Sequence, residues 1–329
     1  MKVKHNEISP KRFQQSGLFN YLKEQAIPLG VLSVMIILAS ILTPVFFTKI
    51  NMQNLFIQQS MIMVVSLGMF VAILSGGIDL SVGSVLAVGS VFAADLLNRT
   101  NPAVAIIGTI FICAILGLVN GLIVAKLQIA PFIVTLGMME FARGIAFWYT
   151  NSSPITWKNA PNAVIFTYIG KGRFFSIPIL TIIMLVMIVF TYFIMKHTVI
   201  GRIIYSIGGN QEAVRLSGID ISVWKIFPYV FSGIMASIGG ILMTARLGLG
   251  APTNGEQLAN DCIASVVIGG TSFTGGKGNI SGVIIGVFIL GIINNLLDLM
   301  NVSSYPQMML KGSIIVAAVI FSTIKDKNA

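Results

Sequence analysis

Charged residues are scarce in this chain. Asp, Glu, Lys and Arg make up 10% of its 329 residues, whereas a soluble globular protein contains about 25%. At the same time 55% of the residues are hydrophobic, so the chain cannot cover its own core with a polar surface. The scarcity of charge excludes an ordinary soluble domain and indicates that lipid is the main solvent of this protein.

Cysteine and histidine are also rare. Cys113 and Cys262 lie far apart in apolar stretches, so we expect buried free thiols and neither a disulfide framework nor a metal site. His5 and His197 are isolated and lie outside the apolar segments. An intramembrane enzyme needs a nucleophile beside a base, so we expect no catalytic residue. The net charge is +10, but the basic residues form no patch interleaved with aromatic residues, so we expect no nucleic-acid partner.

Apolar segments of membrane-spanning length are what the chain has in abundance. About 20 residues of helix cross the hydrocarbon core of a bilayer. Ten segments fit this rule and predict an all-α integral membrane protein: 28–48, 55–75, 80–97, 102–125, 131–150, 177–196, 225–247, 259–271, 280–299 and 305–324. The eighth, 259–271, is too short to cross alone, so we expect its backbone to break inside the protein or beside a cavity.

Ten crossings place both termini on the same side of the membrane. With this arrangement thirteen basic residues fall on the side of the termini and six on the other, and positive charge gathers on the cytoplasmic side. The sequence therefore predicts a cytoplasmic N-terminal segment over 1–27, a membrane domain over 28–324 and a cytoplasmic tail over 325–329.

Two connecting segments are longer than usual. The outer one, 151–176, is interpreted either as a structured cap over the bundle or as a docking surface for an outside partner. The cytoplasmic one, 197–225, contains a short helix with an N-cap candidate at Asn210 and a C′ glycine at Gly218. An isolated helix of this length has marginal stability in water. It must therefore pack against its own bundle or against another protein.

Several strings together identify a family resemblance. They are Ser75-Gly-Gly-Ile-Asp-Leu-Ser-Val-Gly-Ser84, Tyr205-Ser-Ile-Gly-Gly-Asn210, Glu212-Ala-Val-Arg-Leu-Ser-Gly-Ile219 and Ile268-Gly-Gly-Thr-Ser-Phe-Thr-Gly-Gly-Lys-Gly278. From about Phe47 to Val319 the chain resembles the permeases of bacterial sugar-importing ABC transporters, in the branch that handles ribose and related monosaccharides. Two further strings, Tyr149-Thr-Asn-Ser-Ser-Pro154 and Val302-Ser-Ser-Tyr305, are most similar to ribose permeases.

The resemblance implies a subunit of the inner membrane with three kinds of protein partner. These are a second permease copy, identical or a sister chain, a periplasmic sugar-binding protein, and a cytoplasmic ATPase that holds ATP and magnesium. This chain itself is expected to bind no cofactor. Its nearest match to a phosphate loop, Gly275-Gly-Lys-Gly278, lacks the required spacing and the final hydroxyl residue.

The resemblance also implies that the short cytoplasmic helix couples the permease to the ATPase. The residues of this coupling element are Asn210, Glu212, Arg215, Leu216 and Gly218. An amphipathic helix with charges suits a groove on a partner. The alternative is a surface helix that only caps its own bundle.

Ionisable residues inside apolar spans are costly and are expected to face protein or water. Glu140 and Arg143 stand three residues apart, so we expect them to pair on one helix face, and Asp298 and Lys311 are a second candidate pair. Asp261 is a candidate sugar ligand, because a carboxylate accepts hydrogen bonds from hydroxyls. The family usually has a glutamate two residues before this aspartate, where this chain has Ala259.

The remaining polar candidates divide between structure and transport. Asp79 is interpreted as a helix cap near the positive end of a helix dipole. Amides within the spans either line the translocation path or form interhelical hydrogen bonds: Gln58, Gln59, Asn120, Asn294 and Asn295, together with the hydroxyl of Ser60. An ion-coupled secondary transporter, centred on Glu140 and Asp261, remains the alternative function.

Overall fold

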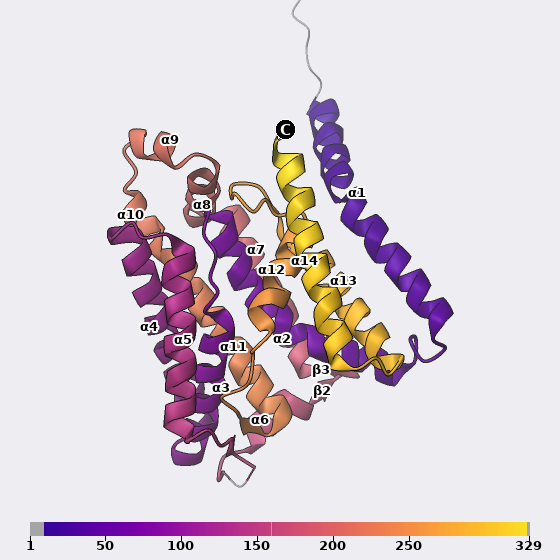
Figure 1. Ribbon diagram of the computed structural model, residues 1–329, viewed down its shortest axis with the longest axis vertical. Coiled ribbons are helices and arrows are strands. Elements are labelled where there is room, and N and C mark those ends of the chain that lie inside the picture. Colours follow the sequence, from indigo (N-terminus) through magenta and orange to yellow (C-terminus); the bar gives the residue numbers. More distant parts are fainter. Residues whose placement is uncertain (1–9, 159, 328–329) are drawn as a thin grey trace, which may run out of the picture.

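The structure is a computed structural model that describes residues 10–158 and 160–327. The predicted terminal segments therefore lie in part outside the described residues, at 1–9 and 328–329. The chain folds into a bundle of helices with two small two-stranded sheets (Figure 1), as the all-α prediction requires. The long helices are α1 (Pro10–Leu42), α2 (Lys49–Leu74), α3 (Val82–Arg99), α4 (Pro102–Lys126), α5 (Pro131–Thr150), α7 (Ile179–His197), α11 (Ile226–Leu247), α13 (Ile280–Leu299) and α14 (Ser304–Lys327). The shorter elements are α6 (Val164–Lys171), α8 (Val199–Gly209), α9 (Gln211–Leu216), α10 (Ile221–Trp224), α12 (Leu258–Ile268), β1 (Ile155–Thr156), β2 (Arg173–Phe174), β3 (Ile177–Pro178) and β4 (Leu249–Gly250).

The first helix differs most from its prediction. It begins at Pro10 and ends at Leu42, whereas the sequence predicts 28–48. Pro44 explains the early end, because a proline disfavours helical geometry in the residue before it. Thr48 then caps the next helix by accepting a hydrogen bond from the amide of Asn51.

Seven stretches within the described helices are long and apolar enough to cross a membrane by length and composition. They are Gln25–Leu42, Lys49–Leu74, Val82–Arg99, Pro102–Lys126, Ile179–His197, Ile221–Leu247 and Ile280–Leu299. The apolar helices Leu258–Ile268 and Ser304–Ile320 are shorter. The predicted total of ten crossings therefore needs further segments besides these seven.

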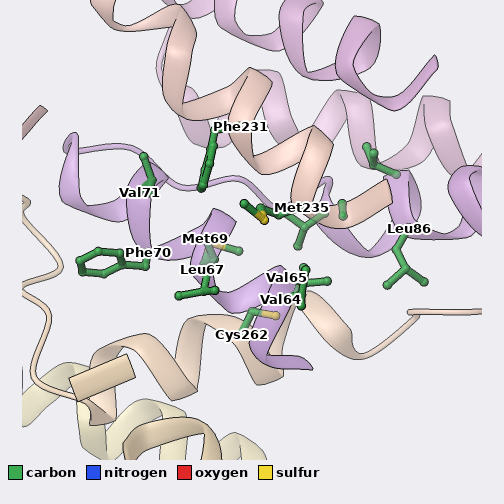
Figure 2. Packing of buried hydrophobic residues seen from close by; sticks show 14 of the residues in the cluster. Val64, Val65, Leu67, Met69, Phe70, Val71, Leu86, Phe231, Met235 and Cys262 are labelled. Atoms are coloured by element: carbon green, nitrogen blue, oxygen red, sulfur yellow. The ribbon is translucent and has the colours of Figure 1, made fainter. Parts of the chain in front are cut away.

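The core surrounds α2, which is apolar on all sides and 83% buried over its most apolar window. Figure 2 shows its side chains, among them Leu67, Met69 and Phe70, packed with Phe231 and Met235 of α11 and with Cys262 of α12. A helix that is hydrophobic all round belongs inside a protein or a membrane. The α11 helix shares this central position and packs on α2, α3 and α4, whereas α1 packs on α13 and α14 packs on α12. Cys113 and Cys262 are both free and buried, as the sequence predicts.

The segment 151–176, predicted to lie on the outer side, is a structured cap on one end of the bundle. Its strand β1 pairs antiparallel with β4, with Ile155 opposite Gly250. Trp157 is buried, and its indole Nε1 donates to the carbonyl of Thr244 at 2.9 Å. In Figure 1 this cap, marked by α6 and β2–β3, lies at the end of the bundle opposite to α8–α10, the start of α1 and the end of α14.

Candidate functional site: a re-entrant segment and a coupling surface

The segment 251–257 enters the bundle without regular secondary structure. It follows β4 and precedes α12. Asn254 donates through Nδ2 to Ser90 Oγ at 2.8 Å, and Ser90 lies near the middle of α3. A Cβ on Gly83 would lie 2.3 Å from the carbonyl oxygen of Gly255, so the two backbones touch. The eighth predicted span, 259–271, contains the 11-residue α12, and the irregular backbone of 251–257, which we call the re-entrant segment, precedes it.

Arg143 holds this segment against α5. Its guanidinium donates to the carbonyl oxygens of Pro252 and Asn254, the second at 2.9 Å. The predicted Glu140–Arg143 pair is therefore wrong: no hydrogen bond or ion pair joins the two side chains within the described residues. The physical reason is that carbonyls outside a helix need donors, and the guanidinium supplies them. The Glu140 side chain is left exposed.

Lys311 also has a different partner from the predicted one. It pairs with Asp261 of α12 at 3.1 Å, and both side chains are largely buried. Asp298 instead accepts a hydrogen bond from Gln307 Nε2 at 2.9 Å. The Asp298–Lys311 prediction is wrong because Lys311 lies two turns into α14, beside α12 and away from the connection that follows α13. Ala259 is buried in the core.

Asp79 lies just before the N-terminus of α3. It is buried, and its carboxylate accepts hydrogen bonds from the amide and the hydroxyl of Ser81. The Ser81 hydroxyl in turn accepts from Asn120 Nδ2 at 3.0 Å, which links α4 to this turn. The cluster satisfies polar groups at a helix start, consistent with the capping interpretation.

The amides of α2 and α13 meet at the helix interface. Asn295 and Asn51 exchange two hydrogen bonds of 2.8 and 2.9 Å between their side chains. Gln59 is buried against Gly291, and Ser60 donates to the carbonyl of Phe56 one turn earlier. Asn51 was not among the sequence-predicted candidates, although an asparagine beside an apolar run is itself a signal for such a pair.

Two path candidates are less enclosed than these. Gln58 of α2 and Asn294 of α13 are both half-buried. The Oδ1 atom of Asn294 is nevertheless buried and has no hydrogen-bond partner among the described residues. Of the six candidate polar side chains in the spans, these two are the ones that are not buried.

The short cytoplasmic-loop helix predicted from the sequence is α9. Asn210 Oδ1 accepts from the amide of Ala213 at 3.0 Å, and Gly218 has a φ of +83°, so both predicted caps are confirmed. Val214 is buried with Ile203, Ile207 and Ile221 of α8 and α10. The helix is therefore anchored to its own bundle through one face.

The other face of α9 is free in this chain. Glu212 and Arg215 form an ion pair of 2.8 Å with side chains that are 62% and 69% exposed, and Leu216 is 78% exposed. These three side chains form the part of α9 that is open to another protein.

A small basic pocket of about 180 Å³ lies at the opposite end of the bundle. Lys158, Lys171 and Arg246 line it, together with Trp157 and neighbouring backbone. Three positive side chains around one pocket favour an acidic partner. These residues were not among the sequence-predicted candidates, because they are separated in sequence and are brought together by the β1–β4 pairing and by the packing of α6 on α11.

Comparison with known proteins identifies the family of this chain. The family model described as branched-chain amino acid transport system / permease component matches residues 51–319. The chain belongs to this family. It is therefore a transport subunit and not an enzyme, and a multi-pass protein of the inner membrane.

Several sugar permeases are similar to this chain over nearly its whole length. The chain is 42% identical over 307 residues to the ribose import permease protein RbsC of Escherichia coli (strain K12), covering 93% of this chain and 95% of that relative. It is 38% identical over 327 residues to RbsC of Bacillus subtilis (strain 168), covering 99% and 100%. It is 32% identical over 315 residues to the L-arabinose ABC transporter permease protein AraH of Azospirillum brasilense, covering 95% and 91%. No solved structure matches the chain.

Proposed function

We propose that this permease forms the membrane pathway of an ATP-driven importer of ribose or a related monosaccharide. The observation that carries the proposal is its similarity to two ribose import permeases over more than nine tenths of the chain. The description of the family refers to amino acids, whereas these relatives are named for sugars, so the full-length relatives decide the solute.

We propose ten membrane crossings with both termini in the cytoplasm. Three further crossings add to the seven long apolar segments. They are α5, the re-entrant segment 251–257 together with α12, and α14. Figure 1 supports an even number of crossings, because the start of α1 and the end of α14 lie at the same end of the bundle as α8–α10. The predicted excess of basic residues is on that side.

We propose that α9 contacts the ATPase that binds ATP and magnesium. Val214 fixes the helix to the permease, while Glu212, Arg215 and Leu216 are presented outward. The pathway would be completed by a second permease copy, either identical or a sister chain. At the outer end, the pocket lined by Lys158, Lys171 and Arg246 would receive acidic groups of a periplasmic sugar-binding protein.

The test is uptake of labelled ribose into proteoliposomes that contain the permease and its ATPase, with loaded binding protein outside and ATP inside. Wild type should show ATP-dependent uptake, and Glu212→Lys should lose it while the permease remains folded. ATPase activity stimulated by a binding protein loaded with another sugar, without ribose uptake, would show that ribose is the wrong solute. Uptake without the ATPase would favour an ion-coupled transporter.

A charge swap separates the two roles of the α9 ion pair. The double variant Glu212→Arg, Arg215→Glu restores an ion pair within the helix but reverses the charges offered to a partner. If the pair only stabilises α9, the double variant should transport like wild type. If it contacts the ATPase, the double variant should remain as defective as Glu212→Lys.

A further inference from the structure

Polar side chains are exposed where the chain re-enters the bundle. Along 251–260 buried and exposed residues are interspersed, and every exposed residue is polar. The exposed residues are Thr253, Glu256, Gln257 and Asn260, which we call the polar edge. Exposed polar residues are ordinary on a soluble protein. They are unusual here, because the surrounding helices expose mainly apolar side chains.

The polar edge lies at the depth of the membrane interior. Its neighbour Asn254 is hydrogen-bonded to Ser90, the ninth residue of the 18-residue α3. The exposed carboxylate of Glu140 is at a comparable depth, since it is the tenth residue of the 20-residue α5, about 14 Å from either end. A charged side chain facing lipid at such a depth costs about 2.5–3.5 kcal/mol or more. These groups therefore face water or another polar surface.

Arg143 ties the two elements into one surface. Its Nη1 donates to the carbonyls of Pro252 and Asn254, and the guanidinium lies within electrostatic range of the carboxylates of Glu140 and Glu256 without forming an ion pair with either in the described structure. The arginine thus holds α5 and the re-entrant segment together and keeps positive charge near two carboxylates. Both carboxylates keep their oxygens free for other hydrogen-bond donors, because no hydrogen bond or ion pair to either is found within the described residues.

Resting on the function proposed above, we propose that the polar edge and Glu140 line the water-filled sugar path, with Glu256 as the main contact for sugar hydroxyls. Carboxylates accept hydrogen bonds from hydroxyls, and the Gln257 amide both donates and accepts. A neutral polyhydroxylated solute matches this set. Arg143 acts as a positioning residue, because its Nη1 already donates to two backbone carbonyls of the re-entrant segment.

Water access provides the first test. Glu256→Cys and Thr253→Cys should react with a water-soluble methanethiosulfonate reagent in the assembled transporter. The matched control is Phe111→Cys on α4, which lies at a similar depth and whose phenylalanine is 65% exposed among apolar residues. The native Cys113 and Cys262 are buried, so wild type gives the background. We expect labelling at 253 and 256 at least tenfold faster than at 111.

The second test separates sugar contact from water access. Glu256→Gln should lower the initial rate of ribose uptake about tenfold, which corresponds to about 1.4 kcal/mol, while ATPase stimulation by loaded binding protein stays near wild type. Glu256→Asp should recover part of the uptake.

Two results overturn the inference while leaving the proposed function intact. One is labelling at 256 as slow as at 111 in an assembly that imports ribose, because the polar edge would then be packed against protein. The other is normal ribose uptake by Glu256→Gln. A wild-type assembly with no ATP-dependent sugar uptake would instead overturn the proposed function and this inference with it.

Discussion

Arg143 stabilises the bundle through contacts that are far away in the sequence. Its half-buried guanidinium donates to two carbonyls of the re-entrant segment. Arg143→Met keeps most of the apolar stem but leaves those carbonyls without their donor. Hydrogen bonds to charged groups contribute about 1.5–3 kcal/mol each, so we expect Tm in detergent to fall by about 5 °C or more.

The same measurement has a matched control on the same helix. Glu140→Gln should leave Tm close to that of wild type, because the Glu140 carboxylate is exposed and is not part of an ion pair in the described structure. Unfolding can be followed with a thiol-reactive dye, since Cys113 and Cys262 are buried until the bundle opens. Equal losses of Tm in both variants would contradict the stabilising role that we assign to the hydrogen bonds of Arg143.

Residue pairing was the least predictable part of the site. The spacing of Glu140 and Arg143 gives them a common helix face, and this was sound local reasoning. The sequence contains no sign that backbone carbonyls of residues more than 100 positions later lie nearer to the guanidinium. Lys311 shows the same limit, because its partner Asp261 is set by the packing of α14 on α12. Local caps such as Asn210 and Gly218 were predictable, because their partners are a few residues away.

At the scale of elements, the helices follow the length of apolar runs. The predicted segment 131–150 coincides with α5, and 280–299 coincides with α13, because Pro131 and Asn279 mark the helix starts. A break of the backbone in this region was also predictable, since the apolar segment 259–271 is too short to cross a bilayer alone. What 251–257 contacts was not predictable, because its partners on α3 and α5 are remote in sequence.

The contact between Gly83 and the re-entrant segment leads to a prediction about element packing. Gly83→Ala would place a Cβ 2.3 Å from the Gly255 carbonyl oxygen, so one backbone must shift. Overpacking of this kind costs about 1–3 kcal/mol. We therefore expect a lower yield of folded protein on size-exclusion chromatography and a lower Tm.

The control for this substitution is Gly137→Ala in α5. Nothing lies within 4 Å of a Cβ at Gly137, and alanine is favoured over glycine in a helix by about 0.8–1 kcal/mol. Its Tm should equal or exceed that of wild type. If Gly83→Ala behaves in the same way, the close approach of the two backbones in the re-entrant region is wrong.

At the scale of the whole molecule, the arrangement of the two ends tests the proposed ten crossings. Ser217 follows α9 and Phe175 lies in the β2–β3 connection, and both are exposed at opposite ends of the bundle (Figure 1). If the membrane crosses the bundle between these ends, the two positions face different compartments. A membrane-impermeant thiol reagent added to spheroplasts should therefore label Phe175→Cys and spare Ser217→Cys.

Permeabilised spheroplasts provide the control, because both variants should then react at similar rates. Wild type should remain unlabelled in both conditions, since its two cysteines are buried. Labelling of Ser217→Cys from outside, with protection of Phe175→Cys, would invert the topology and place α9 out of reach of a cytoplasmic ATPase. Labelling of both positions from outside would exclude an odd number of crossings between 175 and 217, and the ten-crossing arrangement would be wrong, because it requires α7 to be the single crossing there.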